Sequence, residues 1–211
     1  MKIIEPSFEI VYIEDADSIQ KRIEAAGRLC YKSEYNITEN SFFPFIQKII
    51  QSGHHSVIEH ASASVKFICD RGVSHEIVRH RMASYSQEST RYANYSNDRF
   101  GNEITVIKPC FWEEGSDQYS EWLNAMLMAE KSYMALIKSG ATAQQARSVL
   151  PNSLKTEIIV TCNFREWRHI LDLRCSKAAH PQIREIMLPL LIEMHRRLPS
   201  IFSDIFEKYK K

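Results

Sequence analysis

The sequence lacks any long apolar run. No segment reaches the roughly 18 consecutive apolar residues that a membrane-spanning helix needs, and no signal-peptide pattern follows Met1. It also lacks an excess of charge of one sign, because 27 Lys and Arg stand against 26 Asp and Glu. General nucleic-acid binders usually carry a strong basic excess. We therefore expect a cytoplasmic protein that binds neither nucleic acid nor membrane.

Paired cysteines and flexible linkers are absent as well. The five cysteines are scattered, with no C-x-x-C pair, which indicates reduced thiols and no zinc knot. No repeat, low-complexity tract or Gly/Ser-rich linker marks a domain boundary. The sequence therefore predicts one domain over residues 1–211, long enough for a substantial core.

Hydrophobic periodicity predicts helices interspersed with a few strands. Strands are expected at residues 8–13, 61–69 and 154–161. Helices are expected at residues 18–31, 41–51 (ended by Gly53), 73–82, 117–139 (ended by Gly140), 142–150, from Asn163, and from Pro181 with an interruption near Pro189. Residues 84–95 are expected to be irregular or extended. The order shows no regular β-α-β alternation, which favours an α+β fold, a single domain with a central mixed sheet flanked by long helices.

The segment from Arg79 to Tyr92 is the most informative part of the chain. It reads RHRMASYSQESTRY and places three arginines, one histidine and three serines among amide, carboxylate and phenol groups. Arginine forks bind phosphate or carboxylate, and hydroxyls and amides can complete the cage around a polar ligand. A solvated, charged helix end explains the Arg-His-Arg triplet equally well but not the polar residues after it. The segment therefore predicts an anion-binding pocket.

A second segment, residues 53–60, holds three histidines and a carboxylate. His55 and Glu59 are four residues apart, which could indicate a metal pair. Ser56 and Glu59 also match a helix capping box, and no later pair of ligands is found at tight spacing. We therefore expect no metal site, although the capping box leaves two of the histidines unexplained.

Three later arginines lie at positions that allow a function. Arg174 falls on the apolar stripe of the helix that begins at Asn163, so it must either snorkel to solvent or meet a buried anion or polar ligand. Arg165 and His169 lie on a neighbouring face, either as a solvated pair or as a clamp for a phosphate-bearing cofactor. Arg147 lies at a helix C-terminus, where a cation is favourable without any function.

Four segments of the chain, which follow one another in the same order as in that family, resemble motifs of the flavin-dependent thymidylate synthases. Arg79-His80-Arg81, followed by seven residues and Ser89, is similar to the substrate-binding signature of that family. Residues 53–60 resemble its upstream Gly-His segment, residues 146–151 its Ala-Arg-x-x-Leu-Pro element, and residues 163–174 its C-terminal motif. One departure is Ser86-Gln87, where many members have Asn-Glu, so that an amide replaces a carboxylate.

The resemblance implies a homotetramer with shared active sites and FAD held where subunits meet. It implies conversion of dUMP to dTMP, with the carbon from methylenetetrahydrofolate and the reducing equivalents from NADPH through the flavin. The residues implied for dUMP are Glu76, Arg79, Gln87, Glu88, Ser89, Thr90 and Arg91, with Arg147 and Arg174 completing the site from another subunit. Those implied for FAD are His54, Ser56, Glu59, Arg79, His80, Arg81, Gln87, Asn163, Arg165 and His169.

Arg174 is the candidate catalytic residue. A guanidinium can stabilise negative charge on the pyrimidine carbonyls and so make C5 a better carbon nucleophile. Cys110 follows Pro109, as does the nucleophile of the unrelated cysteine-dependent thymidylate synthases, but no flanking histidine is present to activate it. We interpret Cys110 as structural.

Two other classes of function stay open on the residues alone. One is a non-catalytic nucleotide- or RNA-binding protein that uses the same arginine and serine pocket, although the near-neutral net charge counts against RNA. The other is a metal-dependent hydrolase that uses the histidines, which metal analysis would distinguish.

Overall fold

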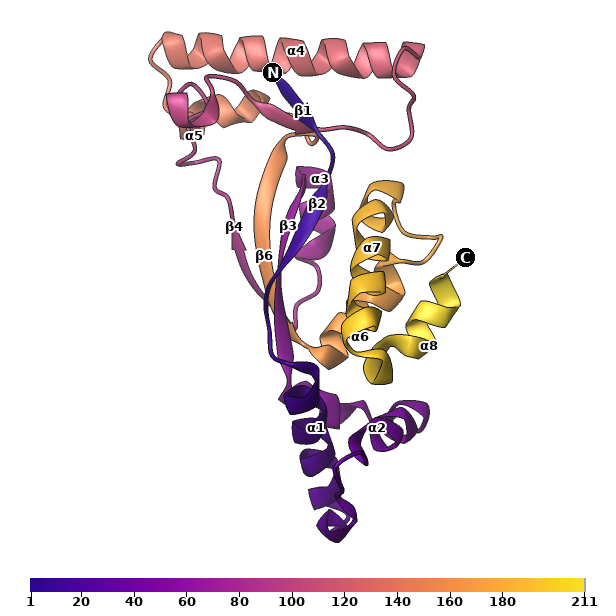
Figure 1. Cartoon of the computed structure of the whole chain (residues 1–211). Coiled ribbons are helices and arrows are strands. Elements are labelled where there is room, and N and C mark those ends of the chain that lie inside the picture. Colours follow the sequence, from indigo (N-terminus) through magenta and orange to yellow (C-terminus); the bar gives the residue numbers. More distant parts are fainter. Residues whose placement is uncertain (211) are drawn as a thin grey trace. The chain divides into compact units, whose positions relative to one another are not determined.

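The computed structural model describes residues 1–210 (Figure 1). The chain divides into two compact units, and each is assembled from three separate segments. Unit 1 comprises Met1–Ser7, Phe67–Arg79 and Ser86–Ile159, and unit 2 comprises Phe8–Lys66, His80–Tyr85 and Val160–Lys211. One domain over residues 1–211 stays a prediction.

The strands form two sheets. β1 (Lys2–Ile4) pairs in parallel with β5 (Thr105–Ile107). The larger sheet has the strand order β2 (Ser7–Ile13), β3 (Ser62–Asp70), β6 (Lys155–Asn163) and β4 (Ser84–Gln87). In β3 every second side chain, from Ala63 to Cys69, is buried, as expected for a strand with one face against a core. The three expected strands are confirmed, and so is the α+β class.

The helices are α1 (Ala16–Cys30), α2 (Phe42–Gln51), α3 (Arg71–Ile77), α4 (Asp117–Lys138), α5 (Ala143–Ala146), α6 (Phe164–Arg174), α7 (Pro181–Arg197) and α8 (Pro199–Tyr209). Short 3₁₀ segments are η1 (Glu34–Asn36), η2 (His55–His60), η3 (Asp98–Phe100) and η4 (Arg147–Val149). Gly53 and Gly140 follow α2 and α4 with positive φ angles of 73° and 95°, which confirms them as helix-ending residues. None of the helices within residues 1–210 combines the length and hydropathy that crossing a bilayer requires.

Three expectations about helices are wrong. The helix expected over residues 73–82 is α3, which ends at Ile77, so the Arg-His-Arg triplet lies beyond it. α7 continues through Pro189, and the break falls at Leu198, which precedes Pro199 and is therefore excluded from the α region. The capping box expected from Ser56 is not formed, because residues 55–60 make the 3₁₀ segment η2 without a side-chain cap.

The core of unit 1 lies beneath α4. Tyr119, Trp122, Met126 and Tyr133 are the buried residues of this helix, and they pack with Leu154 among others. The Trp122 indole Nε1 donates a hydrogen bond of 3.1 Å to Ser153 Oγ, so its polar atom is satisfied within the core. The long helix thus fixes the frame on which the polar loop after β4 is held.

The core of unit 2 is built by helices (Figure 1). α6 contacts η2, α7 and α8, and α2 also contacts α8. Trp167 of α6 is fully buried, and its indole Nε1 donates to the Ala63 carbonyl at 3.0 Å. Asn163 begins α6 as expected, because its side-chain Oδ1 accepts a hydrogen bond from Glu166 N at 3.0 Å. This packing sets the orientation of the polar face of α6.

Candidate active site

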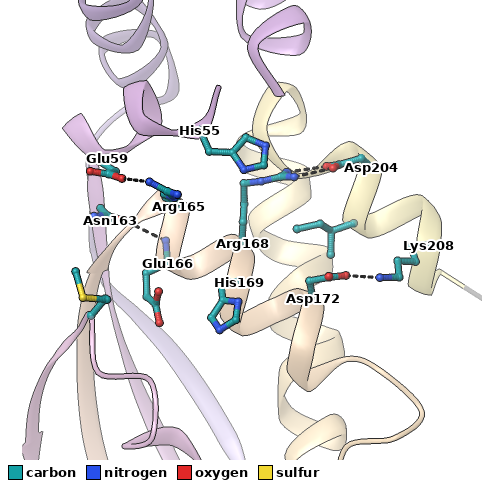
Figure 2. Close-up of a pocket in the computed structure, with 12 residues that line it drawn as sticks. His55, Glu59, Asn163, Arg165, Glu166, Arg168, His169, Asp172, Asp204 and Lys208 are labelled. Atoms are coloured by element: carbon teal, nitrogen blue, oxygen red, sulfur yellow. Dashed lines mark hydrogen bonds and ion pairs between the residues drawn. The ribbon is translucent and has the colours of Figure 1, made fainter. Parts of the chain in front are cut away.

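Unit 2 contains a cavity of about 670 Å³, within the range of small-molecule sites (Figure 2). Glu59 of η2 and Asn163, Arg165 and His169 at the start and on the face of α6 line it, and all four are among the residues implied for FAD. These residues bring together on one side of the cavity the motifs of residues 53–60 and 163–174, which are about a hundred residues apart in the sequence. His54, Ser56 and Arg81 are exposed in the same unit and do not line the cavity.

The ion pair between Arg165 and Glu59, two residues that line the cavity, can rearrange. Arg165 Nη1 lies 2.6 Å from Glu59 Oε1, and the two side chains are 56% and 41% exposed. Exposed pairs of this kind contribute only about 0–1 kcal/mol. Arg165 can therefore turn toward an incoming phosphate at little cost.

His80 joins the cavity wall to Arg174. The imidazole is buried, its Nδ1 lies 3.6 Å from Glu166 Oε1, and its ring meets that of His169 edge-on at 5.5 Å between centroids. Arg174 Nε donates a hydrogen bond of 3.0 Å to His80 Nε2. Since Nε2 accepts this bond, the proton of the neutral imidazole is on Nδ1, facing Glu166.

Arg174 does not snorkel to solvent. It is buried, with 9% of its surface exposed, and it meets His80 inside the unit. Of the two outcomes that its place on an apolar stripe left open, the structure therefore shows burial against a polar side chain. A guanidinium in this environment is poorly screened, so its charge acts strongly on a nearby ligand.

One group of side chains within residues 1–210 has ligand atoms close enough for a metal ion. His80, Glu166 and His169 place these atoms within 4.8 Å of one another. The three histidines of residues 53–60, which raised the question of a metal, are not part of it. The hydrogen bond from Arg174 occupies Nε2 of His80, and the guanidinium charge opposes a cation there.

Two further ion pairs line the cavity and had no signal in the sequence. Arg168 donates to both oxygens of Asp204 at 2.7 and 2.6 Å, and Lys208 Nζ lies 2.7 Å from Asp172 Oδ1 (Figure 2). Both pairs tie α6 to α8, more than 30 residues further along the chain. Burial alone would raise the pKa of Asp204, but the Arg168 guanidinium holds it below its usual value.

Most residues implied for dUMP lie in unit 1. Gln87 ends β4, and the residues up to Arg91 follow in an irregular loop. Thr90 is buried and accepts from Arg147 Nη1 at 3.5 Å, while Ser89 Oγ accepts from the Arg91 amide at 3.3 Å. Glu76 lies in α3, and Arg79, two residues after the end of that helix, is exposed. The structure thus brings Arg147 to the loop; Arg174 belongs to unit 2.

The amide at Gln87 suits its surroundings. Gln87 Nε2 donates to Ser74 Oγ at 2.9 Å and to Thr156 Oγ1 at 3.2 Å. A carboxylate has no proton to donate, whereas an amide can donate to both hydroxyls and leave their protons for other acceptors. The replacement of a carboxylate at this position is therefore matched to two hydroxyls of the same unit.

Cys110 differs from its interpretation as a structural residue. Its side chain is exposed, whereas Cys69, Cys162 and Cys175 are buried. It lies beyond β5 in a loop, where packing does not enclose it. Burial raises the pKa of Cys69 and of Cys175 to about 12, so those two thiols stay protonated.

Comparison with known proteins identifies the family. The family model described as thymidylate synthase complementing protein matches residues 12–200. A flavin-dependent thymidylate synthase of Geobacter sulfurreducens is 34% identical over 203 residues, covering 93% of this chain and 86% of the relative. One from Corynebacterium efficiens is 32% identical over 211 residues, covering 94% and 84%. The chain therefore belongs to the flavin-dependent thymidylate synthase family.

A solved structure shares the fold. The UMP/dUMP methylase PolB from Streptomyces cacaoi, determined with 5-Br UMP, superposes with a TM-score of 0.78. The match covers 99% of this chain and 97% of that one at 21% sequence identity. At this identity the likeness establishes the fold alone.

Proposed function

We propose that this protein is a methyltransferase, a flavin-dependent thymidylate synthase that converts dUMP to dTMP. One dUMP, one methylenetetrahydrofolate, one NADPH and a proton are consumed, and dTMP, tetrahydrofolate and NADP⁺ are released. The single observation that carries the proposal is the buried Arg174–His80 hydrogen bond beside the cavity, because it joins two of the family motifs in one site. The relatives of known name, matched over more than nine-tenths of the chain, support it.

FAD is proposed to bind at the cavity of unit 2, and Arg79 and Gln87 stay predicted FAD contacts. The donor set fits, because Arg165 is free to leave a weak ion pair and His169 and Asn163 supply further polar groups. Arg165 would bind phosphate, and His55, Glu59 and His169 would line the walls. When bound, FAD supplies the transfer of reducing equivalents from NADPH, which no side chain can perform.

Arg174 is proposed as the catalytic residue. Its guanidinium would stabilise negative charge on a pyrimidine carbonyl and raise the nucleophilicity of C5 without itself transferring a proton. His80 accepts its Nε–H, so the remaining guanidinium nitrogens are held in a fixed direction. The Glu166 carboxylate on the far side of the imidazole fixes the tautomer that can accept this bond.

The nucleotide is proposed to bind the polar residues of unit 1. Arg79 and Arg91 supply cations for its phosphate, and Ser89 and Thr90 supply hydroxyls for its polar groups. We propose that Arg147 and Arg174 act on a nucleotide held by another subunit, in a cytoplasmic homotetramer with shared active sites.

The test is flavin content followed by product formation. The purified protein should be yellow, release FAD on denaturation, and form dTMP only with dUMP, methylenetetrahydrofolate and NADPH together. Flavin-free protein that binds dUMP without converting it would indicate a non-catalytic binding protein. Stoichiometric zinc or another transition metal, with loss of activity on chelation, would instead indicate a hydrolase at His80, Glu166 and His169.

A further inference from the structure

The carboxylate of Glu88 is held by two partners within unit 1. Tyr95 Oη donates to Glu88 Oε1 at 3.1 Å, and Lys155 Nζ donates to Glu88 Oε2 at 3.1 Å. The side chains of Glu88 and Lys155 are only 17% and 18% exposed. Both oxygens are therefore engaged by groups of the protein itself.

The two partners are themselves fixed. Lys155 Nζ lies 2.6 Å from Glu157 Oε1 on the same strand, and Glu88 N donates to the Glu157 carbonyl at 2.8 Å. Tyr95 is buried, and its amide donates to Tyr133 Oη in the core at 3.3 Å. The loop after β4 is thus attached to β6 through both backbone and side chain, and to the α4 core through Tyr95.

The charges agree with this attachment. Burial opposes protonation of Lys155, but its hydrogen bond to Glu157 and the charge of Glu88 raise its pKa overall, so it stays an ammonium. Burial, with the charge of Glu88 added to it, raises the pKa of Tyr95, so the phenol stays a donor. A bare carboxylate directly before Ser89 would repel a phosphate bound by that loop, and the Lys155 ammonium, although shared with Glu157, reduces this repulsion.

We propose that Lys155 and Tyr95 are positioning residues that clamp Glu88, and that Glu88 orients the loop Ser89–Thr90–Arg91 rather than binding the nucleotide. The identity of the nucleotide rests on the proposed function; the clamp itself rests on the contacts above. Without the clamp, the loop Ser89–Thr90–Arg91 is no longer held in the orientation that binds dUMP. The affinity for dUMP therefore falls, while kcat is retained because the reacting groups are unchanged.

The direct test is Lys155→Met, which keeps an unbranched side chain, shorter by the terminal nitrogen, and removes the charge. The KM for dUMP should rise about tenfold, which corresponds to about 1.4 kcal/mol, with kcat within about threefold and FAD content unchanged. Lys155→Arg should recover most of the loss, because a guanidinium can make the same contacts. Tyr95→Phe removes only the phenol oxygen that donates to Glu88, and it should raise the KM for dUMP a few-fold. It tests the same clamp if Lys155→Met does not fold.

Lys108→Met is the matched control. Lys108 also lies in unit 1 between two carboxylates, 3.5 Å from Glu5 and 2.7 Å from Glu114, but not beside the loop. Its replacement should leave the KM for dUMP unchanged. An equal rise in KM for both lysine variants would overturn the clamp, because general loss of charge would then explain it.

A double-mutant cycle separates the clamp from direct binding. Under the clamp, Glu88→Gln should have little further effect once Lys155 is Met, since the pair acts as a unit. If Glu88 contacts dUMP itself, Glu88→Gln would lower the affinity by the same factor in both backgrounds, and the proposal is wrong. A parent protein that binds no dUMP would refute the proposed function instead, and calorimetric titration of the parent distinguishes the two failures.

Discussion

At the scale of the residue, replacing Arg174 and replacing Arg165, both on α6, should impair the enzyme in different ways. Arg174 is buried against His80, whereas the Arg165 side chain is 56% exposed and lines the cavity. Arg174→Ala should reduce dTMP formation by about 30- to 1000-fold, equivalent to about 2–4 kcal/mol of lost charge stabilisation, while NADPH still reduces the flavin. Arg165→Ala should weaken FAD retention and lower both half-reactions together.

Stopped-flow flavin reduction beside single-turnover dTMP formation measures both variants. Arg165→Lys is the matched control, because it keeps a cation at the cavity and should retain more FAD than Arg165→Ala. The assignment of Arg174 to the pyrimidine would be wrong if Arg174→Ala still formed dTMP at the parental rate. It would also be wrong if both alanine variants lost the two half-reactions in the same proportion.

Cys110 provides a second residue-scale prediction. Its exposed thiol should react with an alkylating reagent before the three buried cysteines do, yet Cys110→Ala should form dTMP within a few-fold of the parent. The reason is that flavin chemistry replaces covalent thiolate catalysis. Abolished turnover in a folded, FAD-loaded variant would count against the flavin mechanism. Mass spectrometry of labelled peptides and a turnover assay provide the two readouts.

Residues were predictable where the signal is local. The period of α6 places Arg174 on a buried stripe, and the structure confirms its burial. The capping box at Ser56 was wrong because η2 already begins at His55, with His54 as its N-cap residue, so Ser56 lies inside the segment. Lys155 had no signal because its partner Glu88 is 67 positions distant. Such pairs depend on tertiary contacts that no short window of sequence contains.

At the scale of the element, the tie between α6 and α8 should make stability depend on acid. Asp204→Asn removes one partner of buried Arg168 and should lower Tm by about 2–4 °C near neutral pH, equivalent to about 1 kcal/mol after discounting for the 53% exposure of Asp204. The pKa of Asp204 is lowered in the folded state, so its stabilisation is present above the unfolded value of about 3.9 and is lost as pH falls through the lower folded value.

Thermal melts from pH 7 to pH 3 measure this dependence. The difference in Tm between parent and Asp204→Asn should hold between pH 7 and pH 5 and shrink below about pH 4. Glu9→Gln, which removes a more exposed pair with Lys66, serves as the control and should change Tm little at any pH. A difference that grows on acidification would contradict a lowered pKa for Asp204 in the folded protein.

The elements themselves followed from the sequence better than their ends did. Asn163, Gly53 and Gly140 mark helix ends by side-chain or backbone chemistry that is written locally, and all three are confirmed. Pro189 was a false signal, because a long helix with partners along its length tolerates one missing hydrogen bond, whereas Pro199 fixes the preceding residue outside the helical region.

At the scale of the whole molecule, the α+β class was predictable but the division of the chain was not. Each unit takes three separate segments, and β3 and β6 contribute residues to both, so no change of composition marks the boundary. Sedimentation and flavin absorbance on one sample test the proposed assembly. We expect FAD to sediment with a tetramer; a flavin-free monomer that turns over dUMP would contradict shared active sites.

The transfer of carbon to dUMP is proposed to depend on flavin bound at the cavity of unit 2. It is measured most directly in one turnover of FAD-loaded protein that NADPH has reduced anaerobically, mixed with dUMP and isotope-labelled methylenetetrahydrofolate. We predict that the flavin is reoxidised only when both compounds are present, and that one labelled dTMP forms for each flavin reoxidised. Reduced flavin that persists with both compounds present, or dTMP formed by protein without flavin, would contradict this mechanism.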